Sequence, residues 1–114
     1  MPDSDAPVQD TLAVMTAASI ENSDLSPREF MIVRLAALVA VDAPATSYAL
    51  NVGAATDAGL SLDDVQDVLV AVAPLVGTSR VVSAATNIAE GLGLVIALAE
   101  AELEAELDAE DDDA

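Results

Sequence analysis

The chain has 114 residues, 54% of them apolar, and a formal net charge of −18, because 21 acidic residues stand against only 3 basic ones. It contains no cysteine and no histidine, and since its basic residues are all arginine it contains no lysine either. This composition excludes a thiolate nucleophile, an imidazole base and a lysine Schiff base, and the charge argues against nucleic acid or an anionic membrane as a partner.

A chain of this length forms one domain with one core. Phe30 and Tyr48 are its only aromatic residues, and alanine, valine and leucine make up most of the apolar fraction. Small aliphatic side chains bury little area each, so we expect a thin core and further apolar surface buried between subunits of a homo-oligomer.

The sequence also predicts a soluble, cytoplasmic protein. Met1 to Asp5 is acidic and lacks the basic and apolar regions of a signal peptide. The charge-free run 68–79 is interrupted by Pro74 and Gly77 and is too short to span a bilayer. The acidic bias suits a halophile, whose salt screens self-repulsion, but an alanine-rich proteome that uses arginine rather than lysine would give a similar bias.

The first predicted elements are an acidic lead and two helices. Residues 1–7 are expected to be disordered, and Thr11 to Ile20 predicts a helix from the spacing of its apolar residues. Ser26-Pro27-Arg28-Glu29 has the residues of a capping box, with proline at the first helical position. This second helix should run to about Val41, and because it is apolar nearly all round we expect it to be central and buried.

The next predicted helices are 45–58, ended by Gly59, and a helix that begins after the cap Ser61 and is ended by Gly77. A last helix is expected from Arg80 onward, weakened in its middle by Gly91 and Gly93. Since no strand-like alternation appears, the sequence predicts an all-α domain of about five to six helices over residues 8–99. Apolar residues share one face of each of the last two helices: Val65, Leu69, Val72 and Val76, and then Val81, Ala84, Ala85, Ile88, Leu92 and Val95.

The tail, residues 100–114, changes abruptly in composition. Glu100, Glu104 and Asp108 lie four residues apart, a spacing at which like charges destabilise a helix. We therefore expect fraying from about Leu103 and disorder at 111–113. The tail is either a solvating segment or a docking segment for a basic partner.

The segment 25–77 resembles the carboxymuconolactone decarboxylase and AhpD-like family, and the resemblance extends loosely to Leu94. It rests on ordered pieces rather than on one motif. The first piece is Leu25-Ser26-Pro27-Arg28-Glu29, which opens a helix that continues through 33–38. The second is Ala58-Gly59-Leu60-Ser61, which resembles the family's "aGls" element, and the third is Asp63-Asp64-Val65, which resembles its "eEi" element. The last is Val70-Ala71-Val72-Ala73 leading to Gly77, which resembles its "lavyaG" element. The resemblance implies an AhpD-like helical fold that assembles into trimers, hexamers or similar rings.

The redox branch of this family carries Cys-x-x-Cys-x-x-x-His, and the resemblance places that motif on Pro44, Ser47 and Asn51 of this chain. The family's upstream glutamate falls near Ile32, and its proton-relay histidine falls near Thr46. Every redox position is therefore replaced, and the chain lacks the thiolate with which a peroxidase of this family attacks peroxide.

Four residues remain as candidates for a pocket: Arg34, Ser47, Tyr48 and Asn51. Ser47 and Asn51 lie on one face of the predicted helix and either bind a small polar ligand or form a partly exposed polar stripe. Tyr48 is either a pocket residue or a core residue with its hydroxyl at the edge. Arg34 either binds a carboxylate or forms a structural ion pair, for which Asp42 and Asp57 are the possible partners.

The acidic residues give no metal site at this level. Glu29 has a capping role, Glu90 is a weak candidate for acid–base catalysis, and the group Asp63, Asp64 and Asp67 is interpreted as a solvated helix face. No cofactor is expected.

Three functions stay open. The first is a non-redox, homo-oligomeric binding or structural protein of this family, with a small carboxylate as a possible ligand. The second is an enzyme that processes a lactone or small carboxylate through Tyr48, Ser47, Asn51 and an arginine. The third is an interaction module that uses the acidic tail.

Overall fold

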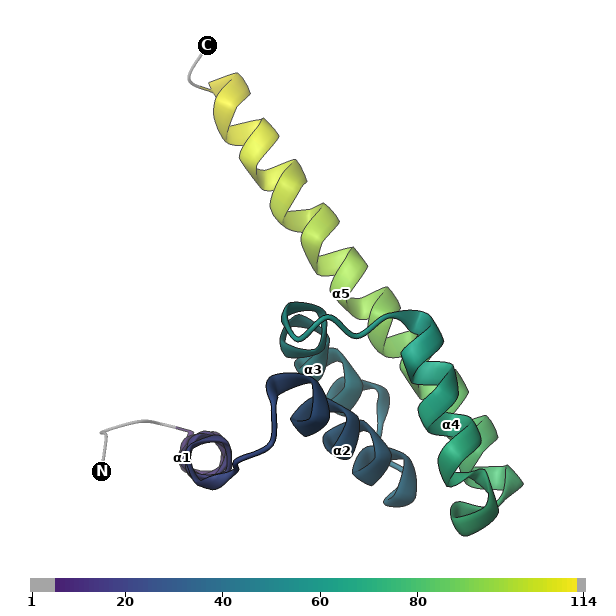
Figure 1. Ribbon diagram of the computed structural model, residues 1–114. Helices are drawn as coiled ribbons and strands as arrows, with labels where there is room; N and C mark the ends of the chain where they lie inside the picture. The colour runs from purple at the N-terminus through teal and green to yellow at the C-terminus, as the bar shows by residue number, and fades with distance from the viewer. Residues whose placement is uncertain (1–5, 113–114) are drawn as a thin grey trace.

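The computed structural model describes residues 6–112, and within them every regular element is a helix. The all-α prediction is therefore confirmed (Figure 1). Residues 1–5 and 113–114 lie outside the described part, so the expected disorder there is not addressed. Two of the residues expected to be disordered near the end of the chain, 111 and 112, are instead helical, and Pro7 already begins the first helix. The helices are α1 (Pro7–Asn22), α2 (Pro27–Ala40), α3 (Ala45–Asp57), α4 (Leu62–Val76) and α5 (Thr78–Asp112).

Two capping boxes set where α2 and α4 begin, as the sequence predicts for α2. The Ser26 hydroxyl accepts from the Glu29 backbone N–H at 3.1 Å, and the Ser26 N–H donates to Glu29 Oε1 at 2.9 Å. Ser61 and Asp64 repeat this reciprocal arrangement at α4. Each pair satisfies backbone donors that the first turn of a helix leaves free.

The helix ends follow local chemistry too. Gly59 and Gly77 adopt φ of 83° and 89°, the left-handed region that glycine enters without a Cβ penalty. The Arg80 guanidinium donates to the Ala40 carbonyl at the end of α2. Asp42, at φ 55°, accepts from the Ser83 hydroxyl at 2.6 Å, so α5 holds the α2–α3 turn in place.

The core is small and lies mainly between α2, α3 and α5. Its buried residues are Val39, Ala43, Tyr48 and Ala84, and the partly buried side chains around them are Leu35, Leu38, Leu69, Val72, Val76 and Ile88. The predicted inward faces of α4 and α5 are thus confirmed in large part. The α2 prediction is wrong for the single chain, since only Met31 and Val39 are buried there and Val33 stays 55% exposed. The reason is that the other helices cover one side of α2 only.

The close packing of α5 on α3 depends on Gly91. A Cβ at this position would lie 2.8 Å from the Ala45 carbonyl oxygen and 3.1 Å from Tyr48 Cβ. Gly91 therefore lets two helix backbones approach, a role that the sequence pattern did not indicate. Gly93, two residues later, has open space around it.

The first helix, α1, stands apart from the others (Figure 1). It has no buried residue, and it makes no contact with another helix among the described residues. The helix α1 is also longer than the helix predicted from the sequence, which covered residues 11–20.

The last helix, α5, extends far beyond the bundle and remains helical to Asp112 (Figure 1). It therefore continues past Leu103, where we expected it to fray, because alanine, leucine and glutamate all favour a helix and no glycine or proline follows Gly93. By length and composition alone, its stretch Thr78–Ala109 could cross a membrane. Those two criteria are weak evidence for a membrane helix, because a mostly buried core helix of a soluble domain also meets them. In α5 one part packs on α3, and 11% of the apolar window is buried.

Fraying of the tail in solution stays a prediction, and added salt should suppress it. Repulsion within the row Glu100, Glu104 and Asp108 costs about 0.2–0.5 kcal/mol per pair. The Debye length shrinks from about 10 Å at 0.1 M salt to about 3 Å at 1 M. Hydrogen exchange of the amides at 103–112 should therefore slow as salt rises, relative to the core amides of α3. Salt-independent protection of the tail would contradict this expectation.

Candidate functional site

A cavity of about 410 Å³ lies where α2, α3, α5 and the first turn of α4 meet. Most of its wall is aliphatic. Leu62 and Ile96 line it and yet are 65% and 58% exposed, so apolar surface remains open to solvent at this cavity. The aliphatic part of the lining comprises Met31, Leu35, Leu38, Val52, Ala55, Leu60, Leu62, Val65, Ile88, Leu92 and Ile96.

The structure brings three of the four candidate residues to this cavity. Arg34 lines it from α2, and Tyr48 and Asn51 line it from α3. Ser47 is not part of the lining, and its backbone carbonyl accepts from the Asn51 side-chain amide at 2.8 Å. This bond fixes the Asn51 side chain against its own helix and leaves its side-chain oxygen without a donor among the described residues.

Arg34 is the cationic residue of the cavity. The predicted ion pair with Asp42 or Asp57 is wrong, because the described residues give Arg34 no salt bridge or hydrogen bond. Its guanidinium instead lies over the Phe30 ring, 4.7 Å from the centroid, one helical turn earlier. The guanidinium donors thus remain available to an anion that enters the cavity.

Tyr48 is 5% exposed, and its hydroxyl is buried with no hydrogen-bond partner in the part of the chain described. Burial raises the pKa of this phenol, and the negative charge of Asp42 raises the pKa further. The hydroxyl therefore stays protonated at neutral pH and acts as a hydrogen-bond donor rather than as a base. A buried donor with no acceptor lowers the stability of the fold.

Replacing Tyr48 with phenylalanine should stabilise the protein. The variant removes an unsatisfied hydroxyl while it keeps the ring, so we expect the free energy of unfolding to rise by about 1 kcal/mol. Urea unfolding of both proteins at one protein concentration measures the difference. A loss of stability in the variant would show that the hydroxyl is satisfied in solution.

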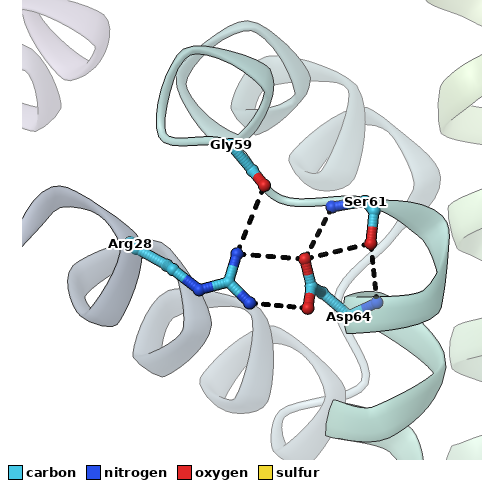
Figure 2. Close-up of polar contacts among 4 residues, drawn as sticks. All are labelled: Arg28, Gly59, Ser61 and Asp64. Carbon is cyan, nitrogen blue, oxygen red and sulfur yellow. Dashed lines mark hydrogen bonds and ion pairs between the residues drawn. The ribbon is translucent and has the colours of Figure 1, made fainter.

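An ion-pair cluster holds the α3–α4 connector beside the cavity (Figure 2). Arg28 Nη2 and Asp64 Oδ1 are 2.6 Å apart, and Arg28 Nη1 donates to Asp64 Oδ2 at 3.0 Å and to the Gly59 carbonyl at 3.2 Å. The Ser61 N–H and hydroxyl donate to the same Asp64 oxygen. This bidentate pair ties α2 to the turn that leads to the cavity residues Leu60 to Leu62.

Local sequence patterns did not predict this cluster. Asp64 was assigned to a solvated face together with Asp63 and Asp67, yet its carboxylate is engaged by two segments. The separation of Arg28 and Asp64 by 36 residues explains why local patterns did not reveal the pair. Among the residues that the structure describes, no group of three or more His, Cys, Asp or Glu side chains could hold a metal ion.

The cluster predicts an acid-sensitive contribution to stability. The hydrogen bond from Arg28, followed by the Ser61 N–H, holds the pKa of Asp64 well below its usual value. Such a carboxyl stabilises the fold above its unfolded pKa of about 4, and the contribution is lost as pH falls through that value toward the folded pKa.

Asp64→Asn should therefore lower the free energy of unfolding at about pH 7, and its deficit relative to the wild type should shrink below about pH 4. Urea unfolding across this range measures the deficit. Asp63→Asn removes the same charge one residue away and serves as the matched control. If the stability deficit relative to the wild type shrinks equally in both variants at low pH, general charge repulsion, not the Arg28 pair, causes the pH dependence.

Comparison with known proteins gives one family. The protein-family model described as the carboxymuconolactone decarboxylase family matches residues 6–91, which cover α1 to α4 and the first part of α5. No significant match was found among curated proteins or among solved structures.

Proposed function

Because the chain belongs to the carboxymuconolactone decarboxylase family, we propose that it is a non-redox member that binds a small ligand as a cytoplasmic homo-oligomer. The ligand would carry one anionic group, such as a carboxylate, on an apolar body. The observation that carries the proposal is Arg34, a cation with free donors at the wall of an aliphatic cavity.

The shape and chemistry of the cavity support this ligand class. A volume of about 410 Å³ lies within the range of about 300–1,000 Å³ typical of small-molecule sites. Arg34 supplies charge and the Asn51 amide oxygen supplies an acceptor, while Tyr48 lines the cavity with its hydroxyl buried. The aliphatic wall then favours an apolar remainder of the ligand.

Exposed apolar surface supports an oligomer. Leu50, Val70 and Leu75 are 85%, 73% and 87% exposed in the single chain. Large aliphatic side chains at such exposures, on several helices, are typical of surfaces that a partner covers. The net charge of −18 would oppose assembly at low salt, and salt would relieve it.

The test is a native mass spectrum of the untagged protein purified from its own cells, recorded near physiological salt. An oligomer with a reproducible extra mass, which is lost in Arg34→Met, would support the proposal. A bare monomer would contradict the assembly, and an extra mass that persists in Arg34→Met would contradict the site.

A second candidate function is an enzyme that processes a lactone or a small carboxylate. It is favoured by the presence of Arg34, Tyr48 and Asn51 in one cavity, where they could orient and polarise a carboxylate substrate. Turnover of a 4-carboxylactone by the pure protein tests it. No turnover would remove the hypothesis, and turnover that survives in both Tyr48→Phe and Asn51→Ala would remove the site assignment.

A third candidate is an interaction module that uses the α5 tail. The family match ends at residue 91, whereas the helix continues to Asp112 with Leu103 and Leu107 56% and 51% exposed among the acids. Deletion of 100–114 should then abolish capture of a basic partner while the fold is retained. Retained capture would end this hypothesis.

A further inference from the structure

We infer that α1 is an exchanged arm, and that the arm of one copy closes the ligand cavity of a neighbouring copy. This inference rests on the proposed function, since it takes the cavity as the ligand site and a homo-oligomer as the working form. It adds the partner element that completes the site.

The first observation is that α1 lacks support within its own chain. It spans 16 residues, buries none of them and touches no other helix among those described. At 16 residues, α1 is only just longer than the limit of about 12–15 residues below which an isolated helix is marginal in water, and tertiary packing supplies most helix stability in proteins. The family match nevertheless begins at residue 6, so α1 is part of the family domain rather than an appendage.

The second observation is the pattern of residues around α1. At 100° per residue, Val8, Leu12 and Met15 share a face that carries no acid, whereas the two acids of the helix, Asp10 and Glu21, fall on the opposite side, which also carries the exposed Val14. The three apolar residues are 71%, 55% and 61% exposed. In a chain of net charge −18, this face can approach another copy without placing like charges together.

The third observation is the surface that such an arm would cover. The cavity is open and aliphatic, and two residues that line it, Leu62 and Ile96, are largely exposed. Its own α1 does not cover it, because α1 contacts none of the helices that form it. A second copy presents the same cavity, uncovered in the same way.

A second copy fits better than a different partner because each copy carries both the arm and the cavity. Reciprocal exchange would cover both exposed surfaces at once, either across a two-fold axis or around a ring. It also doubles the area buried per copy, toward the roughly 800 Å² per partner typical of stable dimers. Closure by the arm would separate a bound ligand from water.

The absence of cysteine from the chain allows a direct test by disulfide trapping. A copy with Met15→Cys is co-expressed with a copy of different mass that carries Ile96→Cys, and the purified oligomer is oxidised. We expect a disulfide-linked heterodimer, because the Cα atoms of the arm and the cavity rim would come within about 7 Å. Ala17→Cys, on the opposite face of α1, is the matched control and should give none.

A second measurement uses charge on the arm. Leu12→Asp with Met15→Asp should shift the mass in solution from oligomer to monomer. Ala13→Asp with Ala17→Asp adds the same charge on the opposite face of α1 and should leave the oligomer intact. The inference would be overturned if both double variants dissociate to the same extent, or if neither dissociates.

The remaining outcomes separate the arm from the ligand site. An intrachain disulfide in a dilute Met15→Cys/Ile96→Cys double variant, without a link between copies, would overturn the inference in favour of an arm that folds back. If no link forms but the oligomer keeps an Arg34-dependent ligand, the inference fails and the proposed function survives. If the link forms and no ligand mass is found, the arm contact stands and the proposed ligand role fails.

Discussion

Gly91→Ala is expected to destabilise the protein by about 1–3 kcal/mol, the usual cost of overpacking a tight contact. The new Cβ would lie 2.8 Å from the Ala45 carbonyl oxygen and 3.1 Å from the Ala49 nitrogen, and backbone atoms cannot rotate away. Helices α3 and α5 would have to separate, which loosens the packing of Tyr48 in the core. Urea or thermal unfolding followed by circular dichroism measures the loss, at one protein concentration because assembly shifts apparent stability.

Gly93→Ala is the matched control for this experiment. It makes the same chemical change two residues later in the same helix, where a Cβ would meet nothing within 4 Å. Removing a helix-interior glycine without a clash should stabilise the protein by about 0.5–1 kcal/mol. If both variants stabilise the protein, the close approach of α3 to α5 is not present in solution.

The contrast between these two glycines shows where sequence reasoning ends. Both were read as weak points of the last helix, because propensity is a local property. In the structure the two glycines differ in the atoms that face them: Gly91 faces α3, which lies more than thirty residues away in the chain, and Gly93 faces nothing within 4 Å. No local pattern carries that information.

Helix starts, in contrast, could be predicted closely, since caps are local. Ser26 and Ser61 were placed at N-caps from neighbouring residues alone, and both accept from the backbone N–H three residues on. Gly59 and Gly77 were placed at helix ends in the same way. Side-chain and backbone groups within one turn decide these features.

The candidate site was predicted only in part. The resemblance directed attention to Ser47 and Asn51, and the apolar context directed it to Arg34, but the residues that close the cavity come from α4 and α5. The expected acidic partner of Arg34 was wrong: the guanidinium lies over the Phe30 ring, and Asp42 accepts from the Ser83 hydroxyl. The acid with which an arginine pairs depends on tertiary packing, which local sequence patterns do not reveal.

The second large expected effect is the loss of ligand affinity when Arg34 is replaced. Arg34→Met should weaken binding of a small carboxylate by roughly 10- to 150-fold, because a hydrogen bond to a charged group contributes about 1.5–3 kcal/mol. Methionine retains length and apolar contact along the cavity wall, so the change removes mainly charge and donors. The protein should fold normally, since Arg34 has no hydrogen bond or ion pair to lose among the described residues.

Arg80→Met controls for the loss of one positive charge from a chain that has only 3 basic residues. Arg80 bonds the Ala40 carbonyl and does not line the cavity, so its replacement should leave affinity nearly unchanged. Isothermal titration with the carboxylate identified by native mass spectrometry, at fixed salt, compares the two variants. Equal weakening in both would mean that long-range attraction of the anion, rather than contact with Arg34 in the cavity, determines binding.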